Sequence, residues 1–392
     1  MIKLKLLFSS YVLSLIALFL YSFTQVDLSL TLSQVSFFQT LEKQFQYIGF
    51  FQRPFSALIF SLILIVLFIS YFSFLYFAKK GYLNLKQIKI LTILTFVSLV
   101  FSYNAFSYDL FNYIFDAKIL TFYHQNPYFH KPLDYMQDPM LNFMRWTHRT
   151  YPYGPTWLFL TAPLSFIGMN YFLLTFFLYK ILMGLSFLGS SYFIYKISEK
   201  LFPAQKLFNL CFWVFNPLII IESLVSSHND LPMIFLFLLS FYLLLQNKNI
   251  KSLVLYLLSI GVKYSTLALA PLFLYISFMK TKKRKINYEK VFFSGLILSL
   301  ATIIYAAFRT TFQPWYLLLP LTLAAFISSN RQILISSVTA SVFAVSIYIP
   351  YVYITDYAPG YPSIIFNIEL IGLIVSIIPL LYFLIIKKIT FD

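Results

Sequence analysis

The sequence is short of charge and has a single cysteine. Only 11% of its 392 residues are Asp, Glu, Lys or Arg, whereas 60% are hydrophobic and 21% are aromatic. A typical soluble domain carries about 25% charged residues, so a soluble globular protein is excluded. Cys211 lies in the apolar run FNLCFWVF, which excludes disulfides within the chain and any metal site built on several cysteines.

Long apolar runs take the place of the missing charge. They recur from residue 6 almost to the C-terminus, and in lipid such runs must be helical because no water satisfies their backbone groups. The expected fold is an all-α polytopic membrane protein, one integral domain over residues 1–392 with about 12–14 transmembrane helices. The predicted spans are 6–23, 55–78, 88–104, 156–168, 171–195, 207–222, 231–245, 252–262, 264–279, 291–308, 314–328, 333–350 and 363–386. Because 6–23 lacks a small-x-small cleavage site, we interpret it as a retained anchor.

Basic residues predict the orientation. The formal charge is +16, and most of the 29 Lys and Arg residues lie in alternate loops: Lys3 and Lys5, 78–89, 196–206, 246–251, 280–290, Arg331, and Lys387 with Lys388. This bias predicts that these loops and both termini are cytoplasmic. We expect no nucleic acid partner, because a basic stripe for nucleic acid would need a solvated domain. The KKRK run fits a cytoplasmic loop, with contact to anionic membrane lipids as the alternative.

Counting crossings leaves two interpretations of residues 156–195. A single span at 171–195 would carry the lysine-rich loop 196–206 to the outside, against the charge bias. Either 156–168 enters the membrane without crossing it, or 171–195 is two short helices with an apex at Lys180. The second interpretation has a parallel in 258–271, which also consists of two short apolar arms around a lysine, Lys263. In both cases the expected outer loops are 24–54, 105–155, 223–230, 309–313 and 351–362.

Acidic residues gather on the predicted outer side, above all in the loop 105–155. In its first part, SYDLFNYIFDAK, Asp109, Asn112, Tyr113 and Asp116 have the spacing of one helix face. Ser107 is a suitable N-cap, and the helix dipole would favour the charged form of Asp109 in the first turn. An ionised aspartate there suits a general base, although acids after a span can also merely solvate a helix end.

Further polar residues have two interpretations each. From Asp138 and Pro139 we expect a short amphipathic interfacial helix, whose cations Arg145 and Arg149 either lie beside headgroups or bind a lipid phosphate. His228, Asn229 and Asp230 are either a turn cap or contacts to sugar hydroxyls or phosphate; one His and one Asp make a weak metal site. Lys263 and Arg309 are isolated cations that either snorkel or neutralise an anionic leaving group.

The order of short motifs carries a resemblance. After the Asp109 loop come NPY (126–128), YGP (153–155), NPL with HND (216–230), GVKY (261–264) and PWY (314–316). This order resembles the GT-C superfamily of integral membrane glycosyltransferases over roughly residues 100 to 320. The nearest look-alikes are glycosyltransferase family 87 and the polyprenol-phosphomannose-dependent mannosyltransferases. The spans before the aspartate loop, and the lack of a soluble C-terminal domain, set the chain apart from oligosaccharyltransferase-type members.

The resemblance implies inverting transfer of a hexose such as mannose from a polyprenyl-phosphate sugar to a lipid- or glycan-linked acceptor at the outer face. Asp109 would take the proton of the acceptor hydroxyl, and cations would stabilise the departing phosphate. The implied donor-phosphate residues are Lys263, Arg309, Arg145 and Arg149. The implied substrate-binding residues are Tyr113, Asp116, Asn126, Tyr128, Tyr153, His228, Asn229, Asp230 and Trp315. No cofactor is expected, and a divalent cation stays open.

Two other classes remain. A transporter or flippase of lipid-linked sugars would also have many spans and buried charges, often with repeated broken helices. Against it, the polar residues gather in one outer loop and not at the midplane. The third class, a ligase or polymerase acting on lipid-linked glycans, is chemically close to the first.

Overall fold

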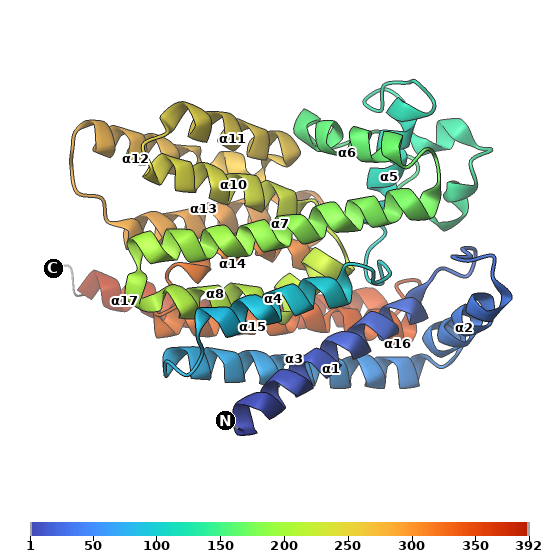
Figure 1. The fold of residues 1–392 in the computed structure, drawn as a ribbon, viewed down its shortest axis with the longest axis horizontal. Helices are drawn as coiled ribbons and strands as arrows, with labels where there is room; N and C mark the ends of the chain where they lie inside the picture. The colour runs from blue at the N-terminus through green and yellow to red at the C-terminus, as the bar shows by residue number, and fades with distance from the viewer. Residues whose placement is uncertain (1, 390–392) are drawn as a thin grey trace.

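The computed structural model describes residues 2–389, and the regular structure within that range is helical, without strands. The long helices are α1 (Ile2–Ser22), α3 (Arg53–Lys79), α7 (Phe172–Leu201), α13 (Tyr288–Arg309), α15 (Arg331–Ser346) and α17 (Tyr361–Ile389). Several of them, such as α3, α7 and α17, run along the long axis of the molecule (Figure 1). The all-α polytopic fold is therefore confirmed.

Shorter elements connect and fill the bundle. The short α-helices are α2 (Ser36–Gln46), α4 (Leu85–Leu99), α5 (Asp109–Thr121), α6 (Pro155–Ile167), α8 (Lys206–Val214), α9 (Pro217–Ile220), α10 (Asp230–Leu245), α11 (Asn249–Val262), α12 (Ala270–Thr281), α14 (Leu318–Ala325) and α16 (Tyr348–Ile354). Two π-helical turns are η2 (Tyr47–Phe51) and η6 (Ile221–Val225). The 3₁₀ turns are η1 (Phe23–Gln25), η3 (Pro132–Tyr135), η4 (Pro139–Phe143), η5 (Pro203–Gln205), η7 (Tyr264–Leu269) and η8 (Pro314–Leu317).

Fewer helices have full membrane-spanning length than the sequence led us to expect. Within the described residues, 6 helices are long and apolar enough to cross, or up to 7 if the bent pair Pro203–Val214 and Pro217–Val225 is one span. Four further predicted spans form apolar helices of 10–17 residues, for example Pro155–Ile167 and Asp230–Leu245. A membrane span needs about 20 residues, so these shorter helices do not have spanning length. Hydropathy alone predicted them as spans, because a helix that packs inside the protein is also apolar.

Helix α7 settles one of the two interpretations of 156–195. It is a single helix of 30 residues, so the hairpin with an apex at Lys180 is wrong. The Lys180 side chain is buried, and its ammonium group donates to the Ser102 hydroxyl at 3.2 Å, to the Val225 carbonyl at 3.1 Å and to the Leu224 carbonyl. This lysine binds carbonyls at the end of η6, which explains a cation inside an apolar helix. The expected break at Lys263 is confirmed, because α11 ends at Val262 and Lys263 is extended.

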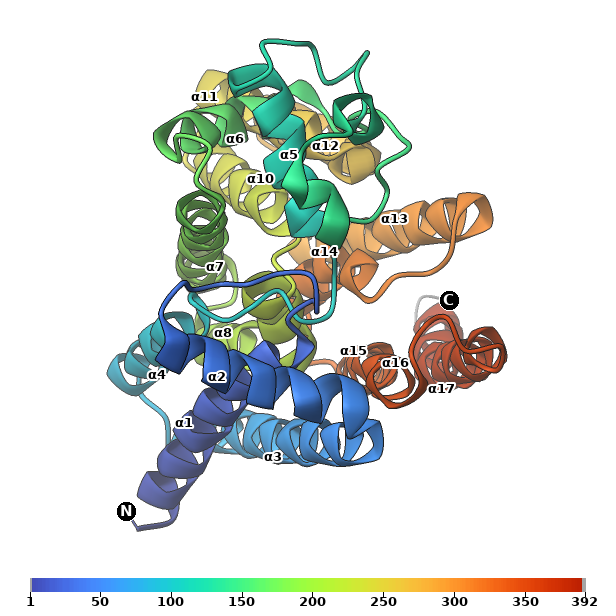
Figure 2. The same cartoon turned by 90° about the vertical axis from the view of Figure 1, so that its right-hand side faces the viewer.

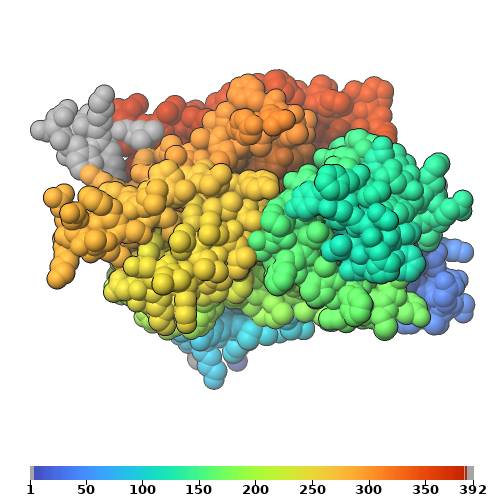
Figure 3. Space-filling view, turned by 90° about the horizontal axis from the view of Figure 1, so that it is seen from above, coloured from blue at the N-terminus to red at the C-terminus, as the bar shows by residue number. Residues whose placement is uncertain are grey.

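Residues 105–155 form one end of the molecule (Figures 2 and 3). Helix α5 is enclosed on every side from Leu110 to Ile119, so its polar face is not a solvated helix surface. The prediction of an interfacial helix that begins after Asp138 is wrong in the length of the helix. Asp138 does cap it, accepting from the Met140 N–H at 2.9 Å, but only the 3₁₀ turn η4 forms. Lys118 binds the same carboxylate at 2.5 Å, which ties the turn to α5.

Two motif glycines bring α6 and α11 into backbone contact. A Cβ on Gly154 would lie 2.2 Å from the carbonyl oxygen of Gly261, and a Cβ on Gly261 would lie 2.2 Å from the Thr156 hydroxyl. Only glycine allows so close an approach. The YGP and GVKY motifs therefore meet, and Tyr153 and Lys263 are carried to the same end of the bundle.

Candidate active site

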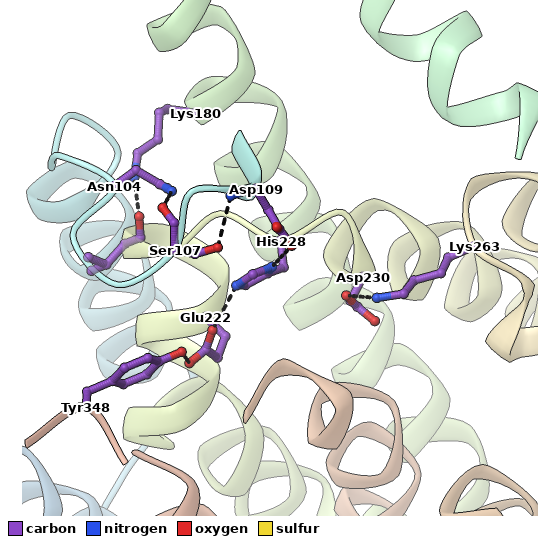
Figure 4. Close-up of polar contacts among 10 residues, drawn as sticks. Asn104, Ser107, Asp109, Lys180, Glu222, His228, Asp230, Lys263 and Tyr348 are labelled. Atoms are coloured by element: carbon purple, nitrogen blue, oxygen red, sulfur yellow. Dashed lines mark hydrogen bonds and ion pairs between the residues drawn. The ribbon is translucent and has the colours of Figure 1, made fainter. Parts of the chain in front are cut away.

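The site is centred on a contact between Asp109 and His228 (Figure 4). Asp109 begins α5, and its N–H donates to the Ser107 hydroxyl at 3.1 Å. One oxygen of its carboxylate lies 3.5 Å from Nδ1 of His228, whose Nε2 lies 3.2 Å from the carboxylate of Glu222. The side chains of His228 and Glu222 are fully buried, whereas that of Asp109 is 13% exposed. Both imidazole nitrogens thus face an acid.

The contact continues through two residues that we did not single out from the sequence. The Tyr348 hydroxyl, on α16, donates to Glu222 at 2.7 Å, so a line of polar groups runs from Tyr348 through Glu222 and His228 to Asp109. Glu222 lies in η6, within the apolar run IIIESLV. An acid inside such a run was a usable signal, since buried ionisable groups in a membrane protein usually have a partner. Tyr348 left no such signal.

Electrostatics favours a charged His228 beside a charged Asp109. Burial by itself lowers the pKa of His228, but the carboxylates of Asp109 and Glu222 outweigh it and raise that pKa. Burial by itself raises the pKa of Asp109, but the hydrogen bond and charge of His228, with the charges of Lys263 and Arg149, lower it. A neutral imidazole has one N–H and would point a lone pair at one of the two carboxylates, so the doubly protonated form fits better.

Asp116, two helical turns further along α5, is held in the opposite state. Burial raises its pKa to about 8, with the Asp109 charge adding to the effect and the Arg149 charge opposing it. At neutral pH it is therefore mainly protonated and can donate a hydrogen bond. A pair of acids whose surroundings push their pKa values apart is the usual arrangement for dividing roles between a base and a donor.

Aromatic side chains surround this part of α5. The Tyr113 ring meets Tyr153 at 5.2 Å and Trp157 at 5.3 Å between centroids, both edge to face. Trp315 stacks on the His228 ring at 3.8 Å with an interplanar angle of 18°. Of the expected substrate residues, Tyr113 and Tyr153 therefore pack together, and His228 and Trp315 form a second, stacked pair.

The HND and GVKY motifs also meet. The Lys263 ammonium lies 2.6 Å from the carboxylate of Asp230 and 5.6 Å from the centre of the Tyr316 ring. The side-chain amide of Asn229 is fully buried and has no hydrogen-bond partner among residues 2–389, an arrangement that a bound ligand would satisfy. Lys263, Asp230 and Asn229 thus adjoin the Asp109 cluster through His228.

Other expected residues lie apart from Asp109. Asn126 accepts from the Tyr128 N–H at 3.0 Å, and the Tyr128 hydroxyl donates to the Tyr153 carbonyl at 3.1 Å, so both hold the loop that carries Tyr153. Arg309 is exposed at the end of α13, with the Tyr305 hydroxyl at 3.2 Å as its neighbour. The charge of Arg309 therefore lies on the protein surface and not beside Asp109.

The two arginines of the 105–155 segment differ. Arg149 is exposed and lies over the Trp146 ring at 4.6 Å, yet its charge acts on both Asp109 and Asp116. Arg145 is ion-paired with Asp356 and so is not directed at Asp109.

Between residues 2 and 389, no group of three or more His, Cys, Asp or Glu side chains is arranged to hold a metal ion.

Comparison with known proteins supplies the class of the reaction. Neither the curated proteins nor the solved structures contain a significant match to the chain. A family model does match, over residues 15–279, a range that holds Asp109, Glu222, His228 and Lys263 but ends before Trp315 and Tyr348. The expected likeness to GT-C-type mannosyltransferases is confirmed, while membership of glycosyltransferase family 87 is not. The chain belongs to the MptA_B family, described as alpha-(1->6)-mannopyranosyltransferase, N-terminal domain, and is a multi-pass membrane mannosyltransferase.

Proposed function

We propose that the protein transfers mannose from polyprenyl-phosphate mannose to a hydroxyl of a lipid- or glycan-linked acceptor, with inversion, at the outer face of the cell membrane. The observation that carries the proposal is the Asp109 carboxylate, kept ionised beside His228 in a chain of a mannosyltransferase family. Asp109 is the general base, because its lowered pKa keeps the carboxylate ionised at neutral pH and an ionised carboxylate can accept a proton.

The reaction is a single displacement at the anomeric carbon. The acceptor oxygen forms the new bond to that carbon as the bond to the phosphate oxygen breaks, and the polyprenyl phosphate leaves with the electron pair. The proton of the acceptor hydroxyl passes to Asp109. Lys263, fixed by Asp230 at 2.6 Å, is the cation best placed among the candidates to stabilise the departing phosphate.

The other groups orient the reactants. Protonated Asp116 can donate a hydrogen bond, and the partly exposed ring of Tyr153, packed on the buried Tyr113, offers an apolar face to a pyranose or to the first isoprene. Glu222 and Tyr348 act through His228 and are positioning residues. This division of roles gives the mannosyl donor and the acceptor separate polar contacts around one base.

The experiment is transfer by purified protein in lipid nanodiscs, with radiolabelled polyprenyl-phosphate mannose and methyl α-mannoside as acceptor. We expect labelled disaccharide with the wild type and almost none with Asp109→Asn. GDP-mannose in place of the lipid donor should give no product. Transfer from GDP-mannose alone would refute the proposed donor, and equal product from both proteins would refute the proposed base.

The rival proposal of a transporter has lost part of its support. It was based on many spans and buried charges, with two short-armed hairpins around Lys180 and Lys263 as a hint of a repeat. Helix α7 runs unbroken through Lys180, so the expected pair of hairpins is reduced to the break at Lys263.

A further inference from the structure

A polar cavity lies beside Tyr108, next to the start of α5. It has a volume of about 260 Å³ and is lined by residues from five separate parts of the chain. Its polar lining includes Asp27, Arg53, Tyr108, Arg145 and Asp356. Tyr108 is the residue directly before Asp109, so one peptide bond joins the wall of the cavity to the proposed base.

The chemistry of the lining is that of a site for a neutral ligand rich in hydroxyls. Two guanidinium groups, Arg53 and Arg145, are balanced by two carboxylates, Asp27 and Asp356, so the cavity has no excess positive charge to attract a phosphate. The Arg145 guanidinium is ion-paired with Asp356 and lies 4.3 Å from the Tyr108 ring centre and 5.2 Å from that of Tyr357. Planar groups with paired donors or acceptors match vicinal hydroxyls, while aromatic faces match the C–H side of a pyranose.

One of the polar groups is left for a ligand. Arg53 is half-buried at the start of α3 and lies 5.7 Å from the Phe50 ring centre. Within the described part of the chain, no carboxylate forms an ion pair with it. Its donors are therefore free of the competition that occupies Arg145. The volume admits one sugar ring, and the segments 142–145 and 355–357 form part of its wall.

We propose that this cavity binds the penultimate sugar ring of a glycan acceptor. The inference rests on the proposed function, because it takes Asp109 as the base that receives the proton of the terminal sugar. With the reacting hydroxyl at Asp109, the ring before it would extend past Tyr108 into the cavity. The preferred acceptor is then an oligosaccharide of at least two sugars, and a single sugar fills only the part next to Asp109.

The test compares acceptors of different length with one donor. Wild-type protein should show a KM for methyl α(1→6)-mannobioside roughly tenfold below that for methyl α-mannoside, the value of one or two good contacts. Arg53→Gln and Tyr357→Ala should remove that preference and leave kcat with methyl α-mannoside unchanged. Tyr353→Ala is the matched control, since Tyr353 is a half-exposed aromatic on neighbouring α16 that does not line the cavity.

A binding measurement separates the two proposals. Saturation-transfer NMR of methyl α(1→6)-mannobioside, recorded without donor, should show saturation of the methyl-bearing ring with the wild type and Tyr353→Ala, and this signal should be lost with Tyr357→Ala. Equal KM values for the two acceptors in the wild type, or Tyr357→Ala indistinguishable from Tyr353→Ala in both assays, would overturn the subsite. If no acceptor is mannosylated, the proposed function fails. The binding assay then decides alone whether the cavity takes a sugar.

Discussion

Two aspartates on one short helix end in opposite protonation states because their neighbours differ. Burial by itself raises the pKa of Asp109, but His228 at 3.5 Å and the charges of Lys263 and Arg149 outweigh it and lower that pKa. Asp116 is buried and forms no ion pair with any residue that the structure describes, and burial raises its pKa to about 8. Their spacing of seven residues, visible in the sequence, placed them on one face but carried no information on these environments.

The first prediction ranks these acids. Asp109→Asn keeps the size of the side chain but cannot take a proton, so kcat should fall by about two to four orders of magnitude. Asp116→Asn should be milder, because asparagine resembles the protonated acid that is present at neutral pH. Transfer kinetics and thermal stability of both variants provide the measurement. If Asp116→Asn or Asp230→Asn abolished transfer while Asp109→Asn stayed active, the base would be another residue.

The second prediction concerns Glu222 and pH. The pKa of His228 is raised in the folded state, so the stabilisation from its protonated form is fully present below its unfolded pKa of about 6.5 and is lost as pH rises through the folded value. Glu222→Gln removes one of the two anions that raise this pKa. In Glu222→Gln, His228 should therefore lose its proton at a lower pH than in the wild type. The pH at which thermal stability falls, and the pH at which kcat/KM falls on the alkaline side, should both be lower than in the wild type.

The control for Glu222 is an acid outside the site. Glu199 pairs with Lys196 at 2.9 Å and with Lys206 at 3.4 Å, far along the chain from His228, and Glu199→Gln should leave the pH profile unchanged. A Glu222→Gln profile that is reduced in height but identical in shape to the wild type would show that Glu222 has a structural role only.

At the scale of elements, the ends of helices bring the site together. Asp109 begins α5, His228 lies just before α10, Lys263 follows α11 and Trp315 lies in η8. The motifs were recognisable in the sequence, and so was the start of α5. The length of α7 and the short η4 were not, because apolar periodicity does not show whether a helix continues through a lysine or stops after one turn.

The third prediction concerns the backbone contact between α6 and α11. Gly154→Ala would place a methyl group 2.2 Å from the Gly261 carbonyl oxygen, a backbone atom that cannot rotate away. The helices must separate, at a cost of about 1–3 kcal/mol of stability, and Tyr153 and Lys263 should move apart. We expect a lower melting temperature and weaker transfer.

Gly360→Ala is the matched control for this glycine, because a Cβ on Gly360 has no neighbour within 4 Å. The same melting and transfer assays apply to both variants. Equal stability of the two variants would mean that α6 and α11 adapt without cost, and that the close approach does not position the site.

On the scale of the whole molecule, the fold gathers the polar groups at and near one end. Residues 105–155 cover that end, and α2 lies beside them (Figures 2 and 3). The apolar helices extend from there along the long axis (Figure 1). Which end faces the cytoplasm is a prediction from the lysine and arginine bias.

The fourth prediction tests that orientation. Reporter tags in 78–89 and 280–290 should be accessible from the cytoplasm, and a single cysteine introduced into 130–138 should react with a membrane-impermeant maleimide from outside. A Cys211→Ser background removes the native thiol, which is buried. Labelling of 130–138 only from the cytoplasmic side would reverse the orientation and move the proposed reaction to the inner face.

Composition and order along the chain were enough to predict helices, a membrane location, the α5 aspartate and the mannosyltransferase class. The helices, the membrane location and the acid at the start of α5 follow from local physics, since apolar runs in lipid must be helical and a helix start favours a nearby acid. The mannosyltransferase class came from the resemblance of the motif order to a known family. The contacts of His228 with Asp109 and Trp315 join residues that are far apart in the chain. Such contacts depend on how helices of particular lengths pack, and periodicity within a segment contains no distance between segments. For the same reason the contacts of Arg145 could not be predicted from the sequence. Its partner Asp356 is 211 residues away, and its place in the wall of the cavity beside Tyr108 became visible only in three dimensions.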